Sequence, residues 1–300
     1  MLVARRNTSK RLRYALEGAA ITALFGVLRI MPLPFASWLI GSLAGLLGPL
    51  LPLHARARHN MMHAMPEMSA KEVTLTLRRM WRHLGRVAGE YPHLAKFRAF
   101  DAGARIEVIG EENLITAKEA GRGMFFTGHI GNWEVSGLPL INYGIPIAFV
   151  YRAPNNPIVD RLIRNARGKG ITKNAIAKGP AGAREMVRQV REGGYTAMLV
   201  DQKMNDGISV PFFGRNAMTA PALAQLARKY DLHVWPVRTE RLKGCRFRVT
   251  IYPHLKLPRS DDATADVAET MQRINDIMEG WIREKPWQWL WPHNRWPKKD

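Results

Sequence analysis

Apolar residues recur at intervals of three and four positions in the segment that follows Ser69. Ser69 and Glu72 form the S-x-x-E pattern of a capping box, which satisfies the free N–H groups at the start of a helix. The apolar positions are Val73, Leu77, Met80, Trp81, Leu84, Val87, Ala88 and Tyr91. This pattern predicts an amphipathic helix over residues 69–91.

After about residue 105 the pattern changes to short β-rich runs that alternate with helical stretches. We expect strands at residues 105–109, 124–127, 145–151, 195–200, 233–239 and 246–252. Helices are expected between them at residues 112–120, 134–142, 157–166, 181–191 and 221–230. Such alternation predicts an α/β fold with a largely parallel sheet flanked by helices. Its active site is expected at the carboxyl ends of the strands.

Two apolar runs precede these elements. Residues 14–31 carry only Glu17 and Arg29 as charges, and a helix of that length is about 27 Å long, close to the roughly 30 Å of a bilayer core. The second run, residues 30–53, is uncharged, but its prolines restrict the helix to about residues 35–48. We therefore expect a membrane-inserted helix followed by an interfacial or re-entrant one, packed through Gly41 and Gly45.

The topology of this anchor stays open. Basic residues flank both apolar runs, so a hairpin with both ends in the cytoplasm satisfies the positive-inside rule, whereas a single span does not. A cleaved signal peptide is the rival interpretation, but more apolar sequence follows in place of a polar mature start.

Charge narrows the choice of partners. Lys+Arg number 45 and Asp+Glu 25, a formal net charge of +20, which indicates anionic surroundings: nucleic acid, an acidic protein or anionic lipid. Arg78, Arg82 and Arg86 place part of that charge in one row on the predicted helix, either a solvated face or a docking surface for lipid phosphates or an acidic carrier protein. The single cysteine, Cys245, excludes an internal disulfide and a zinc site built from cysteines.

The segment with most chemical information lies where the strand at residues 124–127 ends. Gly128 and His129 follow it, and Glu134 comes five residues after the histidine. A turn containing Gly131 can bring the imidazole and the carboxylate together, and a histidine oriented by a carboxylate can remove a proton from a hydroxyl near neutral pH. Backbone N–H groups around Gly131 and Asn132 are candidate donors to an oxyanion.

Other chemistries fit this segment less well. The spacing alone also allows a coincidence without catalysis. It is not the HExxH spacing of a zinc protease, no third metal ligand is evident, and no G-x-S-x-G pattern supplies a serine nucleophile. No metal site is therefore expected.

The sequence from His129 to Glu134, HIGNWE, resembles the H-x4-D/E motif of glycerolipid acyltransferases. Nearly the whole chain is similar to the lipid A secondary acyltransferases of Gram-negative bacteria, the lauroyl and myristoyl acyltransferase family. The further segments that carry this resemblance are residues 66–69, 151–157, 201–203, 211–214, Thr219 and 286–291.

The resemblance implies transfer of a fatty acyl chain from acyl carrier protein to a hydroxyl of a lipid A precursor. It places the enzyme at the cytoplasmic face of the inner membrane, with acyl carrier protein thioester as co-substrate and no other cofactor. Residues 1–55 would be the membrane anchor and residues 56–300 the acyltransferase domain. By the same resemblance, His129 is the general base and Glu134 orients it.

Four further residues are candidates for substrate binding: Arg152, Asn132, Arg167 and Asp201. Arg152 and Arg167 suit phosphate because guanidinium binds it bidentately, although structural ion pairs are equally compatible with either. Asp201 matches the first acid of an Asp-x-Asp pattern whose second acid is replaced by Lys203, which leaves the role of that pair open. Arg164 lies three residues before Arg167, so a small shift in the alignment with the family would make Arg164 the matching arginine.

Two other functions remain open at this point. The His–Glu motif specifies activation of a hydroxyl and not its identity, so the acceptor can be another membrane glycolipid or a phospholipid. A non-catalytic basic protein that binds membrane or nucleic acid is the second alternative, but no RNP-like or helix-turn-helix pattern supports nucleic acid.

Five of the nine tryptophans lie in residues 281–296, where either the bilayer interface or the core would suit them.

Overall fold

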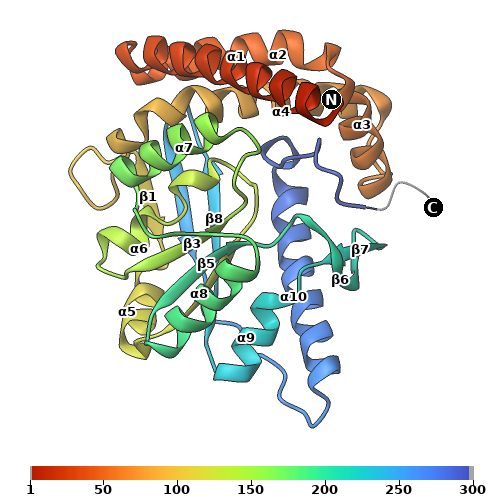
Figure 1. The fold of residues 1–300 in the computed structure, drawn as a ribbon. Helices are drawn as coiled ribbons and strands as arrows, with labels where there is room; N and C mark the ends of the chain where they lie inside the picture. Colours follow the sequence, from red (N-terminus) through yellow and green to blue (C-terminus); the bar gives the residue numbers. More distant parts are fainter. Residues whose placement is uncertain (1, 297–300) are drawn as a thin grey trace.

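The computed structural model describes residues 2–296 and contains one seven-stranded sheet, in the order β1-β9-β8-β2-β5-β3-β4 (Figure 1). Its strands are β1 (Ile106–Ile109), β2 (Gly123–Thr127), β3 (Ile147–Tyr151), β4 (Ala175–Ala177), β5 (Tyr195–Leu199), β8 (Val234–Arg241) and β9 (Phe247–Ile251). All neighbours run parallel except β8 and β9. The expected α/β fold with a largely parallel sheet is confirmed, and each predicted strand lies within about two residues of its observed bounds.

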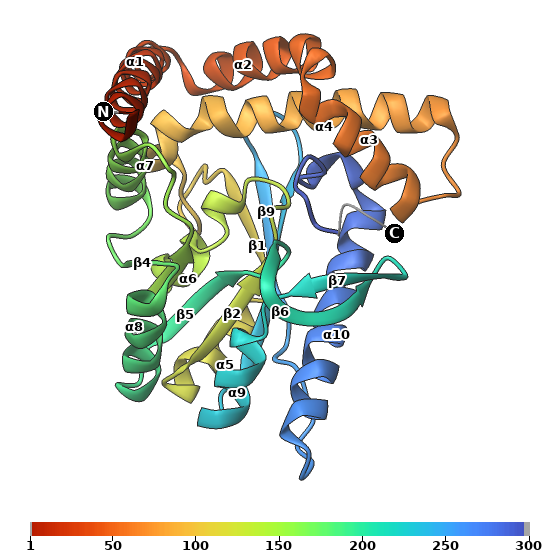
Figure 2. The same ribbon diagram turned by 45° about the vertical axis from the view of Figure 1, so that its right-hand side comes forward.

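Helices cover both faces of this sheet, and α4 crosses its upper end (Figures 1 and 2). The helices are α1 (Leu2–Ile30), α2 (Leu33–Leu47), α3 (Pro52–Ala64), α4 (Ala70–Glu90), α5 (Glu111–Ala120), α6 (Leu138–Asn142), α7 (Pro157–Gly170), α8 (Pro180–Arg191), α9 (Ala222–Tyr230) and α10 (Ala263–Glu284). One core cluster contains apolar residues of α4, α8, α9 and α10, and the other contains those of α5 and α6. The predicted helix at 134–142 is split into a 3-10 turn and α6, because Pro139 begins a new helix.

Helix α4 follows its sequence pattern closely. The hydroxyl of Ser69 accepts the N–H of Glu72 at 3.3 Å, and the Glu72 carboxylate accepts the N–H of Ser69 at 2.8 Å, so the capping box forms as predicted. Val73, Leu77 and Met80 are fully buried on the face toward the sheet. The apolar periodicity therefore places α4 over the upper end of the sheet.

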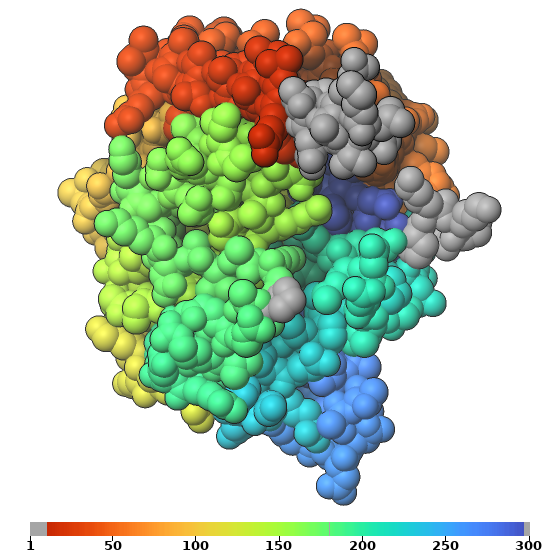
Figure 3. All heavy atoms as spheres, viewed as in Figure 1, coloured from red at the N-terminus to blue at the C-terminus, as the bar shows by residue number. Residues whose placement is uncertain are grey.

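Helices α1 and α2 form a layer on the outside of α4 and α7, visible at the top of Figure 3. Among the described residues, Leu33–Leu50 is the helical stretch long and apolar enough to cross a membrane. The sequence pattern assigned insertion to residues 14–31, but α1 extends over residues 2–30 and includes Arg11 and Arg13. The outward face of α2 exposes large apolar side chains, among them Trp38, Leu46 and Leu47.

The sequence pattern suggested that the small residues of α2 pack against α1. In the structure they pack against α4 instead. A Cβ on Gly85 would lie 2.5 Å from the Cβ of Ala44, and a Cβ on Gly89 would lie 2.6 Å from the carbonyl oxygen of Ala36. The backbones of the two helices can approach this closely only because both glycines lack a side chain. Arg86, in the predicted arginine row, is half-buried with its alkyl chain over Gly41, so the row is not a fully solvated face.

The C-terminal third adds a hairpin that the strand pattern did not predict, β6 (Lys203–Phe212) and β7 (Arg215–Thr219). In Figure 3 the C-terminal segment, coloured blue, lies between this hairpin and the helix layer above it. Trp289, Trp291 and Trp296 are buried there: Trp289 and Trp296 pack on Phe212, and Trp291 packs on Trp289. For these three tryptophans the core position is confirmed and the bilayer interface is wrong.

Candidate active site

His129 lies in the loop that leaves the carboxyl end of β2. The loop turns sharply at Gly131, whose φ of 59° favours glycine. A Cβ there would also lie 2.3 Å from the carbonyl oxygen of Thr239 on β8. Only glycine lets the loop press against β8 in this way, and the imidazole of His129 is thereby held at the edge of the sheet.

The carboxylate beside His129 belongs to Asp201, which follows β5, the neighbour of β2 in the sheet. Asp201 Oδ1 lies 2.7 Å from His129 Nδ1, and its Oδ2 accepts the backbone N–H of His129 at 2.8 Å. The pair fixes the tautomer with the proton on Nδ1, which leaves Nε2 unprotonated, with its lone pair facing the amide of Gln202 at 3.3 Å. Asp201 was predicted to bind substrate; its buried carboxylate instead orients the imidazole.

Asp201 stays ionised although it is almost completely buried. Burial alone would raise the pKa of its carboxyl group. The charge and hydrogen bonds of His129, together with the indole N–H of Trp289 at 2.7 Å from Oδ2, outweigh burial and lower that pKa well below its usual range. A permanent negative charge therefore lies next to Nδ1 at neutral pH.

The residues after Asp201 are held as firmly. The backbone N–H of Lys203 donates to His293 Nε2 at 2.9 Å. Burial lowers the pKa of His293 to about 4, so this ring is a neutral acceptor near pH 7. Asn60 of α3 donates to the carbonyl oxygen of His293 at 2.9 Å and holds the C-terminal segment in place. Gln202 thus lies between two anchored neighbours.

Glu134, the predicted partner of His129, is engaged elsewhere. Its two carboxylate oxygens accept Nε and one terminal nitrogen of Arg167, each at 2.7 Å, and the hydroxyl of Tyr91 donates to the same carboxylate. The interpretation that Glu134 orients His129 is therefore corrected: Asp201 occupies Nδ1. For Arg167, of the two alternatives that the sequence left open, the structure shows the ion pair, which ties the His129 loop to α7.

Asn132 is also a structural residue. Its side chain is completely buried; Nδ2 donates to Glu90 at 2.8 Å and Oδ1 accepts the N–H of Glu134 at 3.2 Å. Both polar atoms are engaged within the protein and the side chain is not exposed, so the structure shows no contact by which Asn132 would reach a substrate. Glu90 further accepts the hydroxyl of Ser37 on α2 at 2.7 Å and a bidentate guanidinium from Arg241 on β8. We call Ser37, Glu90, Asn132 and Arg241 the buried quartet.

The backbone around Gly131 is occupied too. Its N–H donates to the carbonyl oxygen of Gln288 at 3.1 Å, and its carbonyl oxygen lies 2.9 Å from His83 Nε2. Burial, together with the nearby charge of Arg241, lowers the pKa of His83 well below its usual value, so the neutral ring donates from Nε2 while Nδ1 accepts from Arg241. The Gly131 N–H group is not free for an oxyanion, contrary to the sequence-based expectation.

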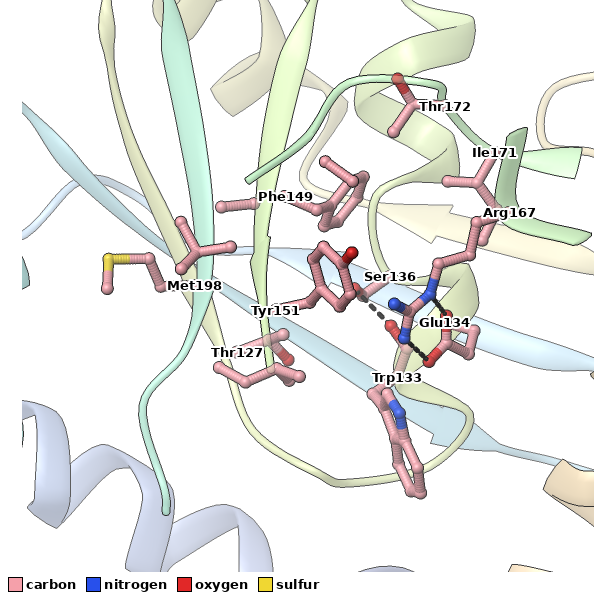
Figure 4. Close-up of a pocket in the computed structure, with 14 residues that line it drawn as sticks. Thr127, Trp133, Glu134, Ser136, Phe149, Tyr151, Arg167, Ile171, Thr172 and Met198 are labelled. Carbon is pink, nitrogen blue, oxygen red and sulfur yellow. Dashed lines mark hydrogen bonds and ion pairs between the residues drawn. The ribbon is translucent and has the colours of Figure 1, made fainter. Parts of the chain in front are cut away.

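An apolar pocket opens at the carboxyl ends of β2, β3 and β5, next to the Glu134–Arg167 pair (Figure 4). Its walls include Thr127, Trp133, Phe149, Tyr151, Ile171 and Met198. The ring of Trp133 lies 5.1 Å from the imidazole of His129, so the pocket begins beside this histidine. Because most of this lining is apolar, it suits a hydrocarbon chain.

Two further predicted features concern ligands. Arg152 is exposed just after β3, and its role as a phosphate ligand stays a prediction. Within residues 2–296 no group of three or more His, Cys, Asp or Glu side chains is placed to hold a metal ion.

Sequence reasoning missed Glu90, Tyr91, Trp289, His293 and Gln202. Glu90 had a readable signal, because it follows Val87 by three positions and so lies on the apolar face of a predicted helix, where a carboxylate needs partners. Tyr91 is adjacent to Glu90 and Gln202 to Asp201, but the sequence does not show which side chains they contact; Trp289 and His293 come from the distant C-terminal segment, where spacing carries no signal.

Comparison with known proteins agrees with this geometry. Residues 4–298 match the model of the family described as bacterial lipid A biosynthesis acyltransferase. A lipid A biosynthesis acyltransferase of Haemophilus influenzae is 25% identical over 242 residues, which cover 79% of this chain and 73% of that protein. A lipid A biosynthesis palmitoleoyltransferase of Escherichia coli (strain K12) is 27% identical over 252 residues, covering 80% and 77%. The chain belongs to the bacterial lipid A biosynthesis acyltransferase family and is an acyltransferase of lipid A biosynthesis.

Proposed function

We propose that the protein transfers a fatty acyl chain from an acyl carrier protein thioester to a hydroxyl of a lipid A precursor, with His129 as general base. The observation that carries this proposal is the buried carboxylate of Asp201 at 2.7 Å from His129 Nδ1. It leaves Nε2 as the acceptor of the hydroxyl proton and stabilises the imidazolium that forms. Glu134 has a different part, which is to hold the loop through Arg167.

The surroundings of His129 suit both substrates. The apolar pocket beside Trp133 receives the acyl chain, with the thioester carbon near the imidazole. Acyl carrier protein and lipid A phosphates are both anionic, and they match a chain of net charge +20. Arg152, at the exposed end of β3, is a candidate to bind one of these phosphates.

The apolar helix Leu33–Leu50 supports placement at the inner membrane, with the catalytic domain on the cytoplasmic face, where acyl carrier protein is available. Because α2 lies directly on α4, the acceptor lipid reaches His129 without leaving the bilayer surface. Nucleic acid is not a partner in this proposal.

The test is acyl transfer from acyl carrier protein to a lipid A precursor, followed by mass spectrometry, in full-length protein with its membrane helices. His129→Ala should lower turnover by about 10² to 10⁴, the usual contribution of a positioned base. Asp201→Asn should lower it by a similar factor, and the double variant should be little worse, because the two side chains act as one unit.

A change at an exposed histidine supplies the control. His63→Ala on α3 should keep normal turnover, since His63 bonds only locally to the carbonyl oxygen of His59. Near-normal activity of His129→Ala would refute the proposed mechanism. Losses at His129 and Asp201 that multiply in the double variant would show that the two residues act independently.

A further inference from the structure

The side chain of Gln202 lies at the one nitrogen of His129 that the structure leaves to the substrate. Gln202 Nε2 is 3.3 Å from His129 Nε2. Because the Nδ1 proton is directed to Asp201, Nε2 carries a lone pair, and the amide nitrogen of Gln202 is the end that must face it. An N–H donor therefore points at the place where the reacting hydroxyl will sit.

We propose that Gln202 is a catalytic residue whose amide N–H group stabilises the oxyanion of the tetrahedral intermediate. This inference rests on the proposed function, since it assumes that His129 is the base. The reacting hydroxyl must come within about 2.6–3.2 Å of His129 Nε2, which places it against the Gln202 amide. The Gln202 amide has two N–H donors. It can therefore give up its contact with His129 Nε2 to the reacting hydroxyl and still donate to the carbonyl oxygen of the thioester carbon that this hydroxyl attacks.

The step balances as follows. The hydroxyl oxygen forms a bond to the thioester carbon, its proton passes to His129 Nε2, and the π electrons of the carbonyl group move to the carbonyl oxygen, where the Gln202 N–H donates. The electrons then return, the C–S bond breaks, and the leaving thiolate takes the proton from Nε2. The products are an ester and a thiol, with His129 restored to its neutral form.

Two observations make Gln202 the donor for this oxyanion. The Gly131 N–H group, which the sequence suggested, is already bonded to the carbonyl oxygen of Gln288, and the Asn132 side chain nearby is bonded to Glu90. Gln202, in contrast, is held by its neighbours: Asp201 receives three hydrogen bonds from His129 and Trp289, and the N–H of Lys203 is bound by His293. A donor fixed before the reaction costs no reorganisation when charge develops.

The experiment compares Gln202→Met and Gln202→Glu with the parent enzyme in the acyl transfer assay. Both variants keep the size of the side chain and remove its N–H donors. We expect kcat to fall by about 10² to 10³ with KM little changed, because the donor acts on the oxyanion alone. Gln272→Met on α10, where the amide bonds only to Asp276, is the control and should behave as the parent.

Each outcome decides the inference. Parent-like kcat in a folded Gln202→Met or Gln202→Glu variant overturns it, and so does a raised KM with unchanged kcat, which would mean that Gln202 binds the ground state. His129→Ala is run in parallel: if it is inactive while the Gln202 variants are active, the base stands and only the role of Gln202 falls. If His129→Ala is active, the proposed function itself is wrong.

Discussion

Replacing Glu90 by Gln tests whether the buried charge of Arg241 depends on its counter-ion in the buried quartet. Glu90 is fully buried and accepts from Ser37, Asn132 and both terminal nitrogens of Arg241. A glutamine of the same shape has one acceptor oxygen and an NH2 group that would face donors. Arg241, itself buried, would keep its charge without a counter-ion.

The expected loss is large. Removing one partner of a buried ion pair costs about 3–5 kcal/mol, a substantial part of the roughly 5–15 kcal/mol by which a domain is stable. At about 2–4 °C per kcal/mol, Tm should fall by about 6–20 °C. Thermal unfolding of the full chain in lipid nanodiscs, followed by circular dichroism, measures it.

Two comparisons make the result interpretable. Glu185→Gln breaks an exposed ion pair with Arg188 and should leave Tm nearly unchanged, because solvent screens that pair. Changing Glu90 to Leu and Arg241 to Met together should recover most of the loss seen in Glu90→Leu alone, since no unpaired charge remains. If Glu90→Gln lowers Tm no more than Glu185→Gln does, the reasoning about buried charge is refuted.

Two further predictions concern the α2 contact and acid sensitivity. Gly85→Leu should separate α2 from α4 and lower Tm, because even a Cβ at this position would lie 2.5 Å from Ala44. Gly280→Leu is the control and should not lower Tm, since the space around Gly280 is open. Equal Tm values for the two variants would contradict the packing argument. The pKa of His293 is about 4 when folded and about 6.5 when unfolded, so its contribution to stability is complete above pH 6.5 and is lost as pH falls toward 4. The urea midpoints at pH 7 and pH 4.5 should therefore differ less in His293→Asn, whose amide oxygen can still accept from Lys203, than in the parent protein. An identical difference in the two proteins would show that His293 does not contribute to acid sensitivity.

Much of the fold was readable because local patterns decide it. Alternating apolar runs located six of the seven sheet strands, and the capping box located the start of α4. The remaining strand, β4, has only three residues and shows no pattern. Helix α10 was not predicted, although Val267, Met271 and Ile274 recur at helical spacing and are sufficient to indicate it.

The site was readable only in part, for a topological reason. The motif identified His129, but it also pointed to Glu134 as its partner because the two are close in the chain. The carboxylate that reaches Nδ1 comes from Asp201, after β5, and β5 is beside β2 only in the folded sheet. Strand order cannot be derived from apolar periodicity, so the exchange of partners could not be foreseen.

The close packing of α2 on α4 joins the apolar helix rigidly to the rest of the fold. A flexible tether would let the catalytic domain rotate and sample a range of distances from the bilayer. Here Gly85 and Gly89 bring the two backbones into contact, and this leaves no room for α2 to tilt independently. If α2 lies in the bilayer, as proposed above, His129 is kept at one depth and in one orientation, and a lipid that diffuses in the plane of the membrane meets the imidazole already aligned.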